Sequence, residues 1–172
     1  VVLDRQAMID EDSDQIIGLF SPSGMPSENR IPSLAEMTNK AVESLSSNEN
    51  GFFLMVEGSQ IDWGGHANET PYVVREVKDF DDAIGVVLAF AQENPGTLVI
   101  ITADHETGGM TINGVNRENT VVDIAWTSTG HTGTPIPLMA YGPHAVEFSG
   151  WWDNTDIGKK VADLLGFENF PL

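Results

Sequence analysis

The sequence predicts an α/β domain built on a largely parallel sheet. Two wholly apolar runs, 52–56 and 98–101, are typical of strands buried on both faces, and an amphipathic stretch, 71–93, lies between them. A strand, a helix and a strand in this order form a right-handed crossover between parallel neighbours. The carboxyl ends of the two strands then share one edge of the sheet, where open α/β sheets bind ligands.

Local signals predict the remaining elements. Ser33 and Glu36 form a capping box at the start of a helix, Asn94-Pro95-Gly96 ends the long helix, and Gly166 closes the last one. The stretch after Gly109 is polar and weakly patterned. In order, the predicted elements are strand 15–20, helix 33–45, strand 52–56, helix 71–93, strand 98–101, strand 135–141 and helix 156–165.

Composition limits the class of protein. A chain of 172 residues with 41% hydrophobic residues has material for one core, so we expect one domain or a piece of one. The formal charge of -18 argues against nucleic acid and anionic membranes as partners, and an anionic substrate would need bound cations to reverse the local field. The absence of cysteine excludes disulfides and thiolate metal sites.

The ends of the sequence suggest that it is a fragment. The chain begins with Val1 and has no initiator methionine, no signal peptide and no apolar run as long as a membrane span. We expect the native start, and any export signal, to lie upstream.

Carboxylates and histidines follow the predicted strands. Asp104 and His105 come directly after 98–101, and Glu57 ends 52–56. Asp62 and His66 stand four residues apart and would share one face of a helical turn. Each group also has a structural interpretation, because Glu57 could accept hydrogen bonds from a loop, Asp104 could cap a helix and His105 could be a core residue.

Two further histidines differ in setting. His131 lies between Gly130 and Gly133, with no face of a helix or strand to fill, which favours a ligand approaching its ring. His144 has no such setting and is predicted to be a surface residue.

Aspartate oxygens with imidazole nitrogens, and no sulfur, suit zinc, and magnesium is preferred where only oxygens converge. Asp62, His66 and His131 would supply three ligands and leave one coordination position open, as in catalytic zinc sites. Asp104 and His105 would supply two ligands of a second site. Two cations about 4 Å apart can hold the attacking and leaving oxygens of a displacement at phosphorus.

Three motifs closely resemble the metal motifs of the alkaline phosphatase family, and the similarity runs from Gly18-Leu19-Phe20 to Asn154-Thr155-Asp156-Ile157. The motifs are Val56-Glu57-Gly58-Ser59-Gln60-Ile61-Asp62-Trp63-Gly64-Gly65-His66-Ala67-Asn68, Thr102-Ala103-Asp104-His105-Glu106-Thr107-Gly108-Gly109 and Thr129-Gly130-His131-Thr132. The resemblance implies an incomplete three-layer α/β sandwich with a central, largely parallel sheet.

The resemblance also implies a site and an activity. Asp62, His66 and His131 would hold the first zinc, Asp104 and His105 the second, and Glu57 a magnesium. The family hydrolyses phosphate monoesters through a phosphoserine intermediate, as homodimers, usually in the periplasm or outside the cell.

The chain departs from the family pattern in what it lacks. The nucleophilic serine, the remaining metal ligands and the phosphate-binding arginine belong to an N-terminal half that is absent, so no catalytic nucleophile is assigned in this chain. Residues 1–172 are therefore interpreted as the C-terminal part of one domain, with a reduced crown-like insertion at about 110–128. Trp63 fills a position where relatives carry varied residues that tune phosphate binding, so a role with substrate is a hypothesis only.

Two alternatives remain. A related superfamily member, a phosphodiesterase or a metal-dependent phosphoglycerate mutase, would share the Asp-His pattern but not the run from Glu57 to Ala67. The chain alone could instead be a non-catalytic metal-binding module. Turnover of a chromogenic phosphomonoester distinguishes the enzyme from the module.

Overall fold

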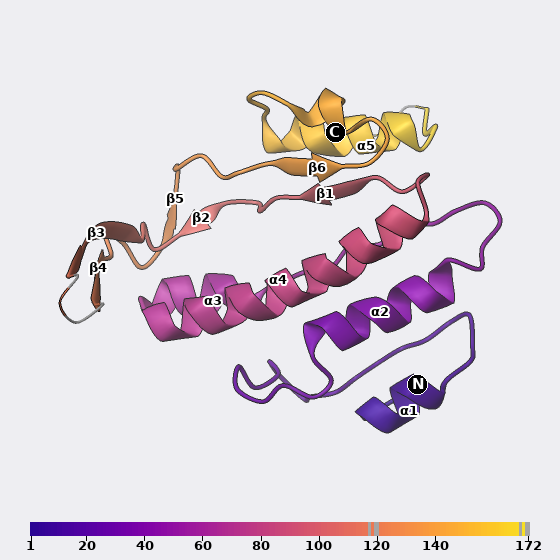
Figure 1. The fold of residues 1–172 in the computed structure, drawn as a ribbon, viewed down its shortest axis with the longest axis horizontal. Helices are drawn as coiled ribbons and strands as arrows, with labels where there is room; N and C mark the ends of the chain where they lie inside the picture. Colours follow the sequence, from indigo (N-terminus) through magenta and orange to yellow (C-terminus); the bar gives the residue numbers. More distant parts are fainter. Residues whose placement is uncertain (117, 119–120, 169, 171–172) are drawn as a thin grey trace.

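The computed structural model describes residues 1–116, 118, 121–168 and 170. Helices and strands are layered as an α/β fold (Figure 1). Helices α2 (Leu34–Leu45) and α4 (Thr70–Glu93) pack together, and α4 also contacts strand β1 (Val99–Ile101). Strand β1 pairs with β6 (Met139–Tyr141). Helix α5 (Asn154–Leu164) lies on the side of this strand pair away from α4, so the strands separate two layers of helix (Figure 1).

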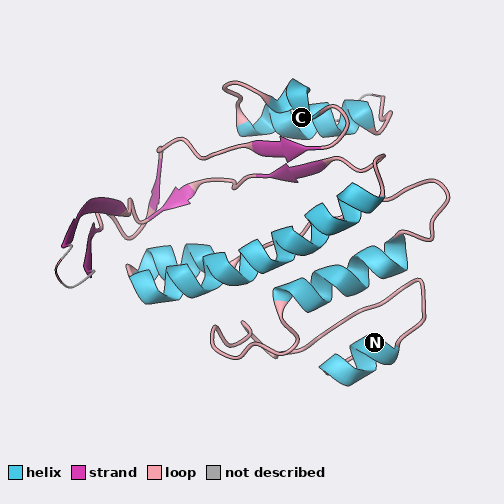
Figure 2. Ribbon diagram, in the orientation of Figure 1, coloured by secondary structure: helices cyan, strands magenta, loops and turns pink. Residues whose placement is uncertain are grey.

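Local sequence signals explain where the helices begin and end (Figure 2). At the start of α2, the Ser33 hydroxyl accepts the backbone N–H of Glu36, and the Glu36 carboxylate accepts the backbone N–H of Ser33, which is the predicted capping box. Helix α5 ends at a left-handed Gly166, with Phe167 N–H donating to Ala162 C=O. The other helices are α1 (Arg5–Asp10), α3 (Gln60–Ala67) and the 3-10 helix η1 (Ala145–Phe148).

The described strands form three antiparallel pairs. In the first pair, Ile100 of β1 lies opposite Ala140 of β6. The second pair joins β2 (Glu106–Thr107) to β5 (His131–Thr132), and the third is a hairpin of β3 (Thr111–Asn116) and β4 (Val121–Ala125). The predicted strand 135–141 is thus reduced to β6, and it runs antiparallel to β1.

The predicted parallel partner of β1 is not paired in the described part of the chain. Residues 52–56 alternate between half-buried and exposed, with Phe53 65% and Met55 74% exposed, so the expectation that both faces are buried is wrong. Phe52 contacts Phe90 of α4, with ring centroids 6.1 Å apart. One face therefore packs on the helix, and without ladder hydrogen bonds the run is not a strand.

Two other expectations also differ from the structure. The predicted strand 15–20 contributes a single bridge, between Gly18 and Val2. The stretch after Gly109, expected to be an unpatterned connection, contains the hairpin of β3 and β4. Most of its apolar residues are exposed, as Ile112 at 67% shows, and only Ile124 and Ala125 of β4 are half-buried. The sequence therefore has no regular alternation of buried and exposed residues that would predict the two strands.

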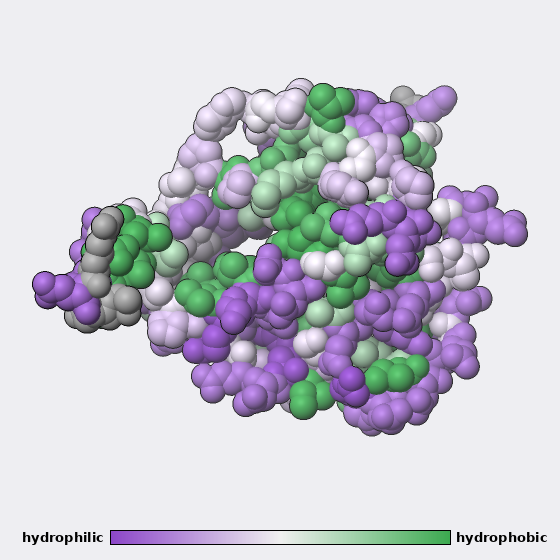
Figure 3. Space-filling view, viewed as in Figure 1, coloured by the Kyte–Doolittle hydropathy of each residue, from purple (hydrophilic) through white to green (hydrophobic). Residues whose placement is uncertain are grey.

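The buried apolar core of the described chain is small. Hydrophilic residues cover much of the α1 and α2 region, whereas apolar residues gather between α4 and β1 (Figure 3). Among the described residues, no helix combines the length and apolar character needed to cross a membrane. The buried apolar residues of this core are Val2, Met8, Val42, Ala83, Ala91, Val99, Phe148 and Ala162.

A candidate metal centre

Helix α3 carries Asp62 and His66 and lies directly against β2. A Cβ atom on Gly65 would stand 2.8 Å from the Thr107 carbonyl oxygen, and one on Gly108 would stand 2.7 Å from the Gly65 carbonyl oxygen. Both contacts require glycine, and Gly108 also has a φ of 91°, which side chains disfavour. The glycines therefore let the two motifs approach through their backbones.

The first turn of α3 is held by the buried amide of Gln60. Its Nε2 donates to the Met25 carbonyl over 2.7 Å, and its Oε1 accepts from the Tyr72 hydroxyl over 2.6 Å. Burial, reinforced by the charge of Glu76, raises the pKa of the Tyr72 hydroxyl, so it stays a donor at neutral pH. These bonds tie α3 to α4 and to the preceding loop.

The loop before α2 is fixed by a buried ion-pair group. Arg30 donates to both oxygens of Glu76, over 2.8 and 2.7 Å, and to Asp79 over 2.5 Å. The Glu76 side chain is only 1% exposed. Burial alone would lower the pKa of Arg30, but hydrogen bonds and charge from the two carboxylates outweigh it and raise that pKa. The guanidinium is therefore permanently charged and holds the loop against α4.

The donor atoms of Asp62, His66 and His131 converge. The two histidine Nε2 atoms are 3.2 Å apart, and they lie 3.4 Å (His66) and 3.6 Å (His131) from the Asp62 carboxylate oxygens. A tetrahedral zinc with bonds of about 2.0–2.1 Å needs its ligand atoms about 3.3–3.4 Å apart. The three contacts are close to this spacing, and they use both Asp62 oxygens, Oδ2 for His66 and Oδ1 for His131.

The histidine rings are oriented by their neighbours. His66 Nδ1 lies 2.6 Å from the Thr129 carbonyl oxygen, which can only accept, so Nδ1 carries the proton and Nε2 is left with a free lone pair. The His131 ring stacks on His105, with centroids 3.5 Å apart and planes 20° apart. Each contact restricts how far the ring can turn away from the cluster.

Asp104 and His105 form a second pair beside the first set. His105 Nε2 lies 3.2 Å from Asp104 Oδ2, a separation that suits two ligands of one cation. The Asp104 side chain is 83% exposed. The chain bends at Asp104, between β1 and β2.

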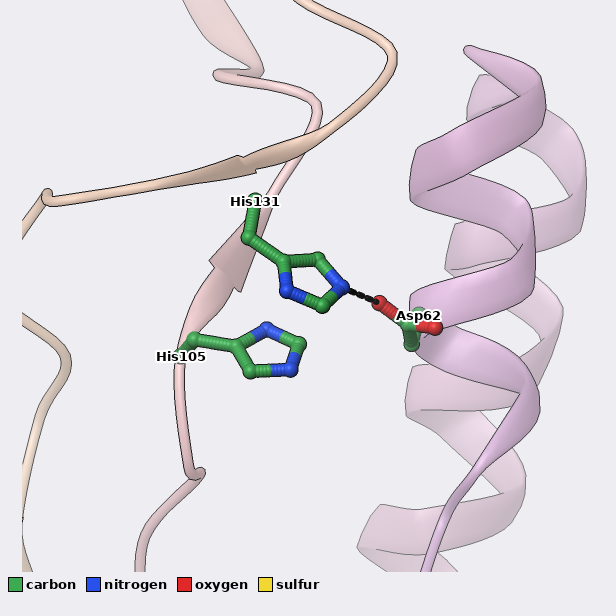
Figure 4. A group of neighbouring side chains, drawn as sticks. All are labelled: Asp62, His105 and His131. Atoms are coloured by element: carbon green, nitrogen blue, oxygen red, sulfur yellow. Dashed lines mark ion pairs between the residues drawn. The ribbon is translucent and has the colours of Figure 1, made fainter.

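Residues from the two proposed ligand sets lie next to each other. Asp62, on α3, faces the rings of His105 and His131, which come from the strand side (Figure 4). One donor atom from each of these three residues lies within 4.8 Å of the others. We favour His66 as the third ligand beside Asp62 and His131, because its Nε2 lies 3.2 Å from His131 Nε2 and 3.4 Å from Asp62 Oδ2, close to the spacing of tetrahedral ligands.

Two residues of the same motifs position the cluster, and the sequence prediction missed them. The Glu106 carboxylate accepts the Gly109 N–H over 2.9 Å and the Thr132 hydroxyl, which joins β2 to β5. The Thr107 hydroxyl contacts both Asp62 and His105. In the sequence, the only signal for these two residues was their place directly after Asp104 and His105.

Among the described residues, no hydrogen bond or ion pair joins Glu57, Trp63 or His144 to this cluster. Glu57 is exposed. Trp63 is 47% exposed, and its ring stands where a Cβ atom on Gly24 would be. His144 is a surface residue, as predicted, with a side chain 55% exposed and paired to Glu147 over 2.7 Å.

The fold and the site together define an α/β protein with a candidate metal centre, formed by carboxylate and imidazole side chains. The family model described as alkaline phosphatase matches residues 1–121 and 115–167. Alkaline phosphatase 3 of Bacillus subtilis is 32% identical over 95% of this chain and 52% of its own length. The chain therefore belongs to the alkaline phosphatase family.

Solved structures agree with this assignment. Alkaline phosphatase from the Antarctic bacterium TAB5 aligns with a TM-score of 0.80 at 42% identity, covering 87% of this chain and 46% of that enzyme. A variant of the TAB5 enzyme with magnesium bound aligns over 98% of this chain and 51% of its own, with a TM-score of 0.82 and 36% identity. The chain thus spans about half the length of these relatives, and its α/β class is that of the family.

Proposed function

We propose that this chain supplies metal ligands to a phosphate monoester hydrolase of the alkaline phosphatase family. The observation that carries the proposal is the convergence of Asp62, His66 and His131. The two Nε2 atoms are 3.2 Å apart, and they lie 3.4 Å from Asp62 Oδ2 (His66) and 3.6 Å from Asp62 Oδ1 (His131). This spacing, in a member of this family, supports a zinc site formed by these three residues.

The other ligand assignments extend the proposal. Asp104 and His105 contribute two ligands of a second zinc, supported by their contact of 3.2 Å. Glu57 contributes to a magnesium site, supported only by its place in the first motif. These cations would supply Lewis acidity and positive charge to a phosphoryl group.

The residues of the chain have distinct tasks in this proposal. His66 presents an unprotonated Nε2 atom, which its Nδ1–H bond to the Thr129 carbonyl orients toward the centre. The stacked His105 ring holds the His131 ring beside it. Local cations would also offset the formal charge of -18, which otherwise repels a phosphate monoester. Trp63, half-exposed next to the zinc aspartate, would contact the substrate.

We further propose that the serine nucleophile comes from the N-terminal half of the same protein, which this chain does not span. Exposed apolar residues near the sheet support an additional covering segment, since a monomer rarely leaves such a face open. They are Phe53, Met55, Met139 and Tyr141. Residues 1–172 would then be one part of a single domain.

The remaining features follow the family. The hairpin of β3 and β4 corresponds to a reduced crown-like insertion at about 110–128, the complete protein forms a homodimer, and it acts in the periplasm or outside the cell. The irregular, exposed hairpin supports the first point only.

Two measurements on the purified chain test this proposal. Equilibration with zinc followed by metal analysis should recover bound zinc, and turnover of a chromogenic phosphomonoester should be absent. Sustained turnover that a chelator abolishes would show that the chain is complete and would overturn the assignment of the nucleophile elsewhere. A chain that binds no zinc would overturn the ligand set itself.

A further inference from the structure

Thr107 lies between the two candidate ligand sets. Its Oγ1 donates to Asp62 Oδ1 over 2.5 Å and lies 3.2 Å from His105 Nδ1. Asp62 belongs to the proposed first zinc site and His105 to the second, so one hydroxyl contacts both sites.

The Thr107 hydroxyl has one hydrogen and can therefore donate to only one of its two partners, Asp62 and His105. Because the carboxylate can only accept, that hydrogen goes to Asp62, and His105 must donate from Nδ1–H to the Thr107 oxygen. In the neutral ring, His105 Nε2 is then unprotonated, and this atom lies 3.2 Å from Asp104 Oδ2. The bond thus leaves His105 in the tautomer that can ligate a cation through Nε2.

Packing holds the Thr107 side chain in place. A Cβ atom on Gly65 would lie 3.0 Å from the Thr107 Cβ and 3.1 Å from its Cγ2, so the helix backbone closes on this face of the threonine. A β-branched side chain has few χ1 options, and this contact removes more of them. The hydroxyl is therefore directed toward Asp62 and His105.

We propose that Thr107 is a positioning residue that couples the two metal sites, orienting the Asp62 carboxylate and selecting the Nδ1–H tautomer of His105. This inference rests on the proposed zinc ligands. Partners in the second shell of a metal site keep ligands oriented, and their loss typically weakens metal binding about 10–100-fold.

Zinc competition against a chromophoric chelator tests the role with matched variants. Thr107→Val keeps the shape and removes the hydroxyl, so zinc affinity should fall about 10–100-fold, whereas Thr107→Ser should remain close to the unmodified chain. Thr38→Val is the control, because it removes a buried hydroxyl that donates to Leu34 C=O on α2. Cobalt should give an altered visible spectrum in Thr107→Val alone.

The tautomer is tested in the unmodified chain, so folding of the variants does not limit the experiment. Long-range proton–nitrogen NMR of the imidazole rings should show His105 protonated at Nδ1. Protonation at Nε2, or a Thr107→Val variant with unchanged zinc affinity and cobalt spectrum, would overturn this inference and leave the proposed function standing. An unmodified chain without zinc affinity would instead overturn the proposed function.

Discussion

The Nε2 atoms of His66 and His131 face each other across 3.2 Å, although the two residues come from a helix and from a strand far along the chain. His66 Nδ1–H is bound to the Thr129 carbonyl, so His66 offers a lone pair toward His131. In the absence of a cation, His131 can donate a proton across this gap. A cation that replaces this proton would connect α3 to β5, and the first prediction follows from that connection.

Zinc should stabilise the folded chain. A ligand that binds only the folded state at about 100 times its Kd adds about 2.7 kcal/mol to the free energy of unfolding. Thermal unfolding followed by circular dichroism should show a higher Tm with zinc and a return to the original Tm with a chelator. A Tm that does not respond to zinc would contradict the ligand set.

Single substitutions should separate the two zinc sites. His131→Ala should weaken zinc binding at the first site, and Asp104→Ala should disrupt the second, because each removes a donor atom from one set. Zinc stoichiometry of the complete protein provides the measurement. His144→Ala is the matched control, since this exposed histidine pairs with Glu147 and lies outside the cluster. If His131→Ala and Asp104→Ala both kept the full zinc content and hydrolysis, the assigned roles would be wrong.

Removal of Arg30 should destabilise the fold strongly. Arg30→Ala leaves the Glu76 carboxylate, 1% exposed, without its cation, and breaking a buried pair in this way costs about 3–5 kcal/mol. Urea denaturation gives the change in the free energy of unfolding. Arg5→Ala is the comparison, because its ion pair with Glu36 is exposed and should matter little. Equal effects from the two variants would refute the role assigned to the buried pair.

The free energy of unfolding should decrease in acid, in part because the Glu36 carboxylate becomes protonated. The Arg5 guanidinium and the Ser33 N–H hydrogen-bond to its carboxylate and lower the pKa of Glu36 from its ordinary value of 4.5. A lowered folded-state pKa stabilises the fold above that ordinary value, and the stabilisation is lost as pH falls through the folded-state pKa. Urea midpoints measured against pH below 4.5 should therefore decline less in Glu36→Gln. Glu49→Gln, in an exposed loop, should leave the decline unchanged.

The three longest helices, α2, α4 and α5, were predicted well because their signals are local, whereas α1 and η1 were not predicted. The capping box of Ser33 and Glu36 is formed with both hydrogen bonds, and the expected helix 71–93 is found as α4, starting one residue earlier. Strands depend on partners that are distant in the sequence. The run 52–56 looked like a buried strand from its composition, but one face is open and no described segment pairs with it.

The sequence by itself determined the family, the positions of the metal motifs and the helices, because spacing and side-chain chemistry are properties of short segments. Only the tertiary structure decided that Thr129 orients His66, that His105 stacks on His131 and that Thr107 joins Asp62 to His105. These contacts depend on α3 and β2 approaching within backbone distance at Gly65 and Gly108. Hydrogen bonds act over about 3 Å, so residue order cannot specify which groups they join until the chain has folded.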